Sequence, residues 1–160
     1  MKTLLHYLFV LCFNILPAVH SQCIKDQQQS LLHLKESILS YSFEVQQTWN
    51  SSTNCCSWVG VNCTSNGHVV GLDLSFKFIY YLIPGSFANF PNLRELDLRG
   101  NYISYIPESF ANISNLRVLD LSGNDISGPI LGSFANFSNL RVLNLRANDI
   151  SGPIPGSFAN

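Results

Sequence analysis

The feature that most constrains the fold of this 160-residue chain is a sequence that repeats itself from position 69 onward. Four segments align, at 69–92, 93–115, 116–139 and 140–160, and the last is incomplete. The third and fourth segments differ at only four of 21 aligned positions, so their similarity is not accidental. A period of this length is typical of a solenoid, in which each unit buries its apolar face against its neighbours.

The pattern within each repeat is L-x-x-L-x-L-x-x-N-x-I, which is the leucine-rich repeat signature. Leucines such as Leu96 and Leu98 alternate with polar residues, so they point to one side of a short strand. We therefore predict a leucine-rich repeat solenoid, a right-handed horseshoe of the α/β type. A parallel sheet should form its concave face, and short helical or 3-10 turns should form its convex face.

Two recurring residue types are interpreted as structural. Asn101, Asn124 and Asn148 stand where the chain leaves each strand, and a buried amide there can satisfy backbone groups of adjacent turns. The first repeat has Lys77 at this place, which predicts a looser turn. Aromatic and aliphatic residues of the S-F-A-N segments are expected to pack in the convex wall, namely Phe87, Phe90, Phe110, Ile113, Phe134, Phe137 and Phe158.

An acidic column could suggest the paired carboxylates of an enzyme. Asp73, Asp97 and Asp120 occupy one repeat position, Asn144 continues the column, and neighbouring strands lie about 4.8 Å apart. This regularity favours a structural or solvated ladder. We find no phosphate loop, metal cluster or catalytic triad motif, so we predict no enzyme activity and no cofactor. The basic residues are scattered, so nucleic acid is not an expected partner.

The first 21 residues have the layout of a secretory signal peptide. Lys2 precedes an apolar run at 4–16, and Val19 and Ser21 are small residues before a possible cut at Gln22. The run is too short to cross a bilayer comfortably. The alternatives are a membrane anchor or a buried N-terminal helix. We predict secretion, and we find no later apolar run of transmembrane length.

Four cysteines remain after the predicted signal peptide, at positions 23, 55, 56 and 63. An even number of cysteines in a secreted chain indicates a disulfide framework. A bond between the adjacent Cys55 and Cys56 would be strained, because neighbouring side chains diverge. Two pairings remain open, and we favour Cys23–Cys55 with Cys56–Cys63. Zinc or redox chemistry is disfavoured, because the spacing lacks a second ligand pair or a C-x-x-C motif.

Residues 22–68 are interpreted as a cap that covers the first core face of the solenoid. The segment 25–41 predicts one amphipathic helix, with Asp26 as a possible N-cap and Gln29 three residues later. Its apolar stripe and the bulky residues of the cap are Leu31, Leu32, Leu34, Ile38, Leu39, Trp49 and Trp58.

Several segments together resemble the N-terminal cap of plant extracellular leucine-rich repeat proteins. They are Cys23, D-Q-Q-Q-S-L-L-H-L-K, Trp49, C-C-S-W-V-G-V-N-C and G-H-V-V-G-L-D-L-S, and the later G-P-I-P at 152–155 is similar to the plant-specific repeat. The resemblance is nearest to receptor-like proteins of the disease-resistance type and to receptor kinase ectodomains. It implies the pairing Cys23–Cys55 and Cys56–Cys63. Such receptors carry more repeats, so we expect a fragment or a truncated product.

The resemblance implies a non-catalytic extracellular recognition module, the N-terminal part of a receptor-like protein. Its expected partner is a peptide or protein ligand in defence or developmental signalling, with a co-receptor kinase as a further candidate. The expected location is the apoplast, or the plasma membrane if an anchor belongs to the full protein. The alternatives are a secreted inhibitor of a cell-wall-degrading hydrolase, of the polygalacturonase-inhibitor type, and a non-functional remnant.

Ligand contacts are expected at concave positions that alternate with the buried leucines. At one of these positions two repeats have arginine, Arg99 and Arg146, where the other two have serine. This difference predicts a surface of mixed charge. The candidate positions are Asp73, Ser75, Glu95, Asp97, Arg99, Val118, Asp120, Ser122, Val142, Asn144 and Arg146.

Four sequons predict N-glycosylation, at Asn50, Asn62, Asn112 and Asn136. Asn112 and Asn136 lie between apolar residues of the S-F-A-N turns and should face outward on the convex side. Asn62 is the weakest candidate, because Cys63 follows it and can oxidise first. The alternative is a chance occurrence of sequons in an asparagine-rich chain.

Overall fold

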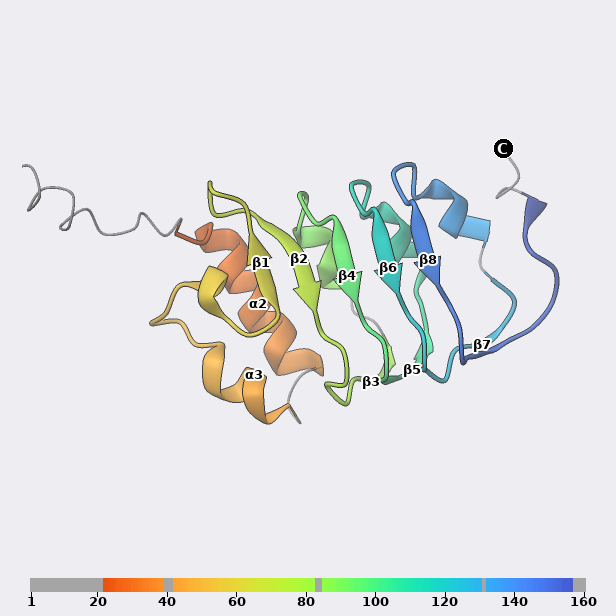
Figure 1. Cartoon of the computed structure of the whole chain (residues 1–160), viewed down its shortest axis with the longest axis horizontal. Coiled ribbons are helices and arrows are strands. Elements are labelled where there is room, and N and C mark those ends of the chain that lie inside the picture. Colours follow the sequence, from red (N-terminus) through yellow and green to blue (C-terminus); the bar gives the residue numbers. More distant parts are fainter. Residues whose placement is uncertain (1–21, 39–41, 83–84, 131, 157–160) are drawn as a thin grey trace, which may run out of the picture.

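The computed structural model of the chain describes residues 22–38, 42–82, 85–130 and 132–156. The predicted signal peptide, Leu39 and Phe158 lie outside the described residues. Figure 1 shows a row of strands side by side, with short helical turns behind them and the cap helices at the N-terminal end. This arrangement is the leucine-rich repeat solenoid that the sequence predicts.

The concave sheet contains five strands in the order β1-β2-β4-β6-β8. Each parallel strand comes from one repeat, and Leu72, Leu96, Leu119 and Leu143 are in register across the sheet. The alternation of leucine and polar residues fixes this register, because a slip of one residue would turn every leucine to solvent. The strands are β1 (Val61–Cys63), β2 (Val69–Asp73), β4 (Glu95–Asp97), β6 (Val118–Asp120) and β8 (Val142–Asn144).

Two small parallel sheets, which the sequence analysis did not anticipate, form beyond the concave sheet. Strand β3 (Tyr80–Leu82) pairs with β5 (Tyr102–Tyr105), and β7 (Ser127–Gly128) pairs with β9 (Asp149–Ile150). They arise because the residues after the asparagine position, which is Lys77 in the first repeat, continue in extended conformation beside those of the next repeat. They create a second edge of the solenoid, below the concave strands in Figure 1.

The convex wall consists of three 3-10 helices, η2 (Gly85–Asn89), η3 (Glu108–Asn112) and η4 (Gly132–Asn136). Their phenylalanines are buried, as predicted, but they meet mainly at edges. Phe110 contacts Phe87 and Phe137 at centroid distances of 5.9 and 6.1 Å, both nearly perpendicular. Perpendicular rings place a positive edge against a negative face, which stabilises the wall beyond its apolar burial.

The recurring asparagines tie adjacent repeats together, as predicted. Asn101 accepts from the backbone N–H groups of Lys77 and Ile79, and it donates to the carbonyl groups of Leu74 and Leu98. The Asn101 amide is buried, so its bonds satisfy backbone groups of the first repeat that have little access to water. Asn124 and Asn148 repeat this arrangement one and two repeats later.

The lysine at position 77 predicts a looser turn in the first repeat, and the structure shows a turn that differs at a single backbone position. Phe78 has a φ angle of 58°, whereas Tyr102 and Asp125, at the same place in the next two repeats, have no positive φ angle. Phe76, with φ 54°, shares the left-handed backbone of Gly100 and Gly123. The ammonium group of Lys77 forms a 2.7 Å ion pair with Glu44 of the cap. This turn is therefore not simply loose, because its lysine joins the first repeat to the cap.

The cap contains more structure than the one predicted helix. Helix α2 (Lys25–Ile38) buries Leu31 and Leu34, and a second helix, α3 (Phe43–Thr48), follows it. The role of Asp26 as N-cap is wrong, because α2 begins at Lys25 and Asp26 lies in its first turn. The N-terminal position is set by Ile24, whose carbonyl accepts from Gln28 and whose N–H donates to Gly67.

Two disulfides fix the cap. Cys23 is bonded to Cys55 and Cys56 to Cys63, with Cα–Cα distances of 5.4 and 5.5 Å. This is the pairing that the sequence analysis favoured. The short 3-10 turn η1 (Cys55–Ser57) directs the adjacent cysteines to different partners.

Polar side chains of helix α2 join the cap to the first repeat and to helix α3. The Gln27 side chain accepts a 2.7 Å hydrogen bond from the backbone N–H of Val69, where β2 begins. Lys35 donates to the carbonyl groups of Gln46 and Trp49 at the end of α3, where a positive charge is favourable. The cap is therefore joined to the first repeat as well as closed on itself.

Candidate functional site: the concave sheet

Seven of the eleven predicted ligand-face residues lie on the concave strands in two parallel columns. One column contains Asp73, Asp97, Asp120 and Asn144, in register on β2, β4, β6 and β8. The other contains Gly71, Glu95, Val118 and Val142 on the same strands. The remaining four predicted residues follow two residues after the first column, namely Ser75, Arg99, Ser122 and Arg146. The leucines between the columns point into the core, so the polar side chains lie on the outer face of the sheet.

The carboxylates of the acidic column have two kinds of surroundings. Asp73 and Asp120 each accept from the N–H and the hydroxyl group of the serine two residues later, Ser75 and Ser122. Asp97 has Arg99 at that place, so it accepts the backbone N–H and forms only a 3.4 Å ion pair. The change from serine to arginine in one repeat thus removes a hydroxyl donor from the central aspartate.

These surroundings shift the pKa values in opposite directions. Burial raises the pKa of Asp97, and the charges of Asp73 and Asp120 add to this effect against the opposing influence of Arg99. Burial would also raise the pKa of Asp73, but the bonds from Ser75 and the charges of Arg99 and Lys77 lower it overall.

The pKa of Asp120 is lowered in the same way. Burial acts against the shift, but the bonds from Ser122, the amide of Asn144 and the charge of Arg99 outweigh it. The column is therefore a ladder of solvated, hydrogen-bonded carboxylates.

A shallow hollow of about 310 Å³ lies over the N-terminal half of the concave face. Its charged lining is entirely acidic, although the sequence analysis expected mixed charge. Arg146 lies two strands away from Asp97, and Arg99 is directed toward Asp97 and the ring of Phe76. The lining residues are Asn62, Gly71, Leu72, Asp73, Glu95, Leu96, Asp97, Val118 and Asp120.

The four glycosylation candidates occupy different environments. Asn112 and Asn136 are exposed at the ends of η3 and η4 on the convex side. Asn62 is exposed on β1 and lines the acidic hollow, so its position on the concave side was not foreseen. The Asn50 side chain bonds Ser52 within a turn. Glycosylation at all four positions remains a prediction.

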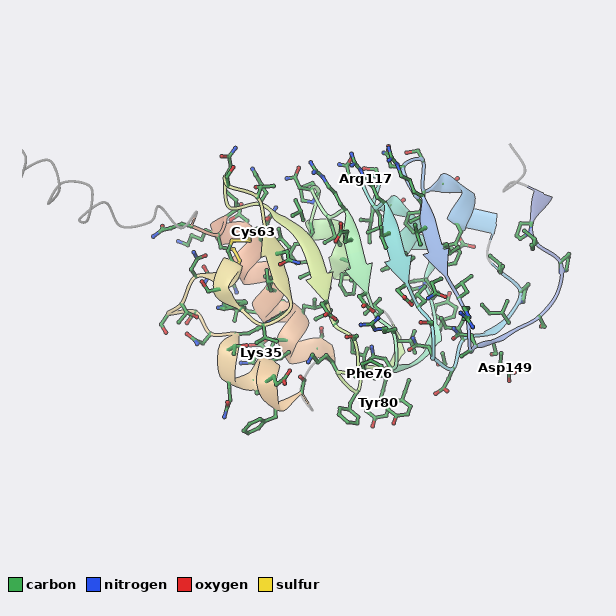
Figure 2. All side chains as sticks on the ribbon, in the orientation of Figure 1. Lys35, Cys63, Phe76, Tyr80, Arg117 and Asp149 are labelled. Atoms are coloured by element: carbon green, nitrogen blue, oxygen red, sulfur yellow. A yellow bond between two sulfur atoms is a disulfide. The ribbon has the colours of Figure 1, made fainter. Side chains whose placement is uncertain are left out.

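Sequence reasoning missed a second feature, a group of exposed aromatic residues next to the concave face. It arises where the first two repeats replace the polar residues of the third and fourth, a difference visible in the repeat alignment. Figure 2 shows Phe76 and Tyr80 at the edge of the solenoid opposite Arg117. We call this group the aromatic strip, and it contains Phe76, Phe78, Tyr80, Tyr102 and Tyr105.

A sheet of this repeat, closed at one end by a disulfide-bonded helical cap, defines an extracellular type of leucine-rich repeat protein. Sequence profiles agree, since "Leucine rich repeat N-terminal domain" matches residues 24–64, and "Leucine rich repeat" matches residues 68–126 and 139–160. The chain belongs to the leucine-rich repeat proteins, and it is similar to receptor-like proteins of plants.

Two curated relatives from Arabidopsis thaliana illustrate the relationship. Receptor-like protein 7 is 33% identical over 87 residues, and Receptor-like protein 47 is 33% identical over 105 residues. These matches cover 52% and 62% of this chain, but only 9% and 13% of the relatives. The chain thus corresponds to a small part of their length.

Two solved structures show the same fold. One is the Arabidopsis receptor kinase HAESA in complex with the peptide hormone IDA and the co-receptor SERK1. It aligns with a TM-score of 0.76 at 31% identity, over 84% of this chain and 23% of that chain. The other is the BIR3–SERK2 complex of Arabidopsis thaliana, with a TM-score of 0.72 at 31% identity, over 81% of this chain and 73% of that chain. Among the described residues, no helix is long and apolar enough to cross a membrane.

Proposed function

We propose that the chain is an extracellular, non-catalytic recognition module that binds a peptide or protein ligand on its concave sheet. The observation that carries the proposal is the hollow between Asp73, Glu95 and Asp120, where polar groups are held in register on a rigid sheet. Backbone hydrogen bonds and buried leucines fix the spacing of these groups. A ligand therefore meets a preorganised surface and pays little for ordering it.

The similar proteins from Arabidopsis thaliana support this role. Receptor-like proteins and a hormone-bound receptor kinase share the repeat and the cap, so recognition is preferred here over inhibition of a hydrolase. Secretion, with residues 1–21 as the signal peptide, 22–68 as the cap and 69–160 as the repeats, is part of the proposal. A co-receptor kinase is a proposed second partner, by analogy with the SERK1 complex.

The test is binding of synthetic plant apoplastic peptides to the secreted, disulfide-bonded chain, followed by substitution on two faces. The concave variant changes Glu95 to alanine and Asp120 to asparagine, because both side chains line the hollow. The matched control changes Glu108 to alanine, because this carboxylate is exposed on the convex side. We expect a loss of affinity of at least about tenfold in the concave variant and no change in the control. Equal affinity of both variants would show that this part of the sheet is only a scaffold.

A further inference from the structure

The aromatic strip exposes more apolar surface than a leucine-rich repeat requires. Its five rings are between 44% and 64% exposed. With about 200 Å² for each ring, they present roughly 500 Å² of accessible surface. A patch of this size lies in the upper part of the range of about 300–600 Å² that the largest patches on monomers reach. Such patches often mark a binding site.

The chain supplies an internal comparison for these positions. Where repeat one has Phe76, Phe78 and Tyr80, repeat three has Gly123, Asp125 and Ser127. Where repeat two has Tyr102 and Tyr105, repeat three has Asp125 and Gly128. The fold is therefore compatible with small or polar residues at all five positions. Packing of the solenoid does not explain the aromatic residues.

The backbone at two of these positions lies in the left-handed region, which side chains other than glycine rarely adopt. Phe76 adopts φ 54° at a position where Gly100 and Gly123 have φ 65° and 63°. A side chain other than glycine is disfavoured there. Phe78 has φ 58°. The first repeat thus holds two exposed phenylalanines in place against the preference of its backbone.

The rings are also ordered with respect to one another. Tyr80 and Tyr102 stack at a centroid distance of 5.0 Å and an angle of 7°, and Phe78 lies 6.4 Å from Tyr102. The ring of Phe76 lies close over Gly100, and the Arg99 guanidinium group is 6.0 Å from its centroid. Tyr, Phe and Arg together are typical of protein interfaces.

The area of the strip and the charge of the hollow limit the kinds of ligand that can bind there. About 500 Å² is less than the roughly 800 Å² that each partner buries in a stable protein complex, so the strip alone does not suit a permanent dimer. The adjacent hollow is lined by Asp73, Glu95, Asp97 and Asp120 with no basic side chain. A cationic ligand is favoured there, while aromatic or aliphatic groups are favoured on the strip.

We propose that the aromatic strip and the acidic hollow together bind a polypeptide segment in which lysine or arginine alternates with aromatic or aliphatic residues. The basic groups occupy the hollow and the apolar groups cover the strip. The assignment rests on the proposed recognition function for the peptide nature of the partner, and it adds the ligand class and a second contact surface.

The test uses three acetylated and amidated peptides, K-F-K-L-K, E-F-E-L-E and K-S-K-S-K, titrated into the isotopically labelled, disulfide-bonded chain. Backbone NMR resonances report which residues bind. We expect K-F-K-L-K to shift the resonances of Tyr80, Tyr102 and Asp97, and the two control peptides to bind about tenfold more weakly. Equal binding of all three peptides, or no shift on the strip, would overturn the proposal.

The strip variant takes its residues from repeat three, with Phe76→Gly, Phe78→Asp, Tyr80→Ser, Tyr102→Asp and Tyr105→Gly. We expect it to fold and to bind K-F-K-L-K about tenfold more weakly. If the five substitutions together prevent folding, the single substitution Tyr102→Asp is the second variant. If binding survives in both but is lost in the concave variant Glu95→Ala/Asp120→Asn, the strip proposal fails and the recognition function stands. If no peptide of any class binds the concave sheet, the recognition function fails as well.

Discussion

The middle of the concave sheet and its C-terminal end carry the same leucine pattern but differ in how deeply the leucines are buried. Leu96 and Leu98, in the second repeat, have at most 1% of their surface exposed. Leu143 and Leu145, at equivalent positions of β8, are only partly buried. Strand β4 has a neighbour on each side, whereas β8 pairs only with β6 among the described residues. A leucine-rich repeat is therefore stable through its neighbours, and the cap provides the neighbour that the first repeat needs.

The largest expected effect is the loss of a cap disulfide. Replacing Cys23 and Cys55 by serine opens a loop of sequence separation 32, and replacing Cys56 and Cys63 opens one of separation 7. From the entropy of loop closure we expect losses of roughly 3–4 and 2–3 kcal/mol in the free energy of unfolding. Denaturant titration of both variants measures the order, and a larger loss for the shorter loop would contradict this account.

The second prediction compares one asparagine near the cap with its equivalent near the other end. Asn101→Ala removes a buried amide that bonds two repeats, so we expect a loss of roughly 2–4 kcal/mol. Asn148→Ala removes the same bonds at a partly exposed place, where water can replace them, so we expect about 1 kcal/mol. Chemical denaturation measures both values, and equal losses would mean that burial does not distinguish the two ends.

The third prediction concerns local opening without any substitution. Amide protons of 140–156 should exchange faster with solvent than those of 93–115, because the last repeat has fewer buried contacts. Hydrogen exchange followed by mass spectrometry gives the rates for both segments. Equally slow exchange in 140–156 would show that the last repeat does not depend on a further neighbour.

The smallest expected effect concerns the middle of the acidic column. At neutral pH, Asp97→Asn removes a partly buried charge between Asp73 and Asp120, so we expect a gain of a few tenths of a kcal/mol. The folded state raises the pKa of Asp97 above 3.8, so in the native chain its protonation stabilises the fold as the pH falls toward 3.8. The lowered pKa values of Asp73 and Asp120 mean that their contribution is lost when the pH falls below 3.8.

The gain from Asp97→Asn should therefore shrink or reverse between pH 7 and pH 3. Denaturant titrations at several pH values measure the difference between variant and native chain. The control is Glu95→Gln, which lies on the same strand outside the acidic column. A difference that stays constant with pH would show that the folded state does not alter the protonation of Asp97.

The repeat pattern by itself determined the solenoid, the register of the leucines, the buried asparagines and the convex phenylalanine wall. These features follow from local periodicity, because every repeat carries the same signal and needs the same neighbour. The adjacent cysteines left two disulfide pairings open, and the resemblance to plant leucine-rich repeat caps implied the one that the structure contains. Such inferences need no knowledge of distant contacts.

Other features were decided only by the tertiary structure. The ion pair of Lys77 with Glu44 joins residues 33 positions apart, and the bond from Val69 to Gln27 spans 42 positions. The acidic hollow forms because Arg99 turns toward Phe76 and Asp97, and Asn62 reaches the concave side through an antiparallel strand of the cap. The five aromatic residues of the strip differ visibly in sequence from their equivalents in the third repeat. Their stacking and exposure, however, depend on how adjacent repeats pack together. Periodicity fixes which face a residue takes, whereas charge balance and exposure depend on which side chains become neighbours in space.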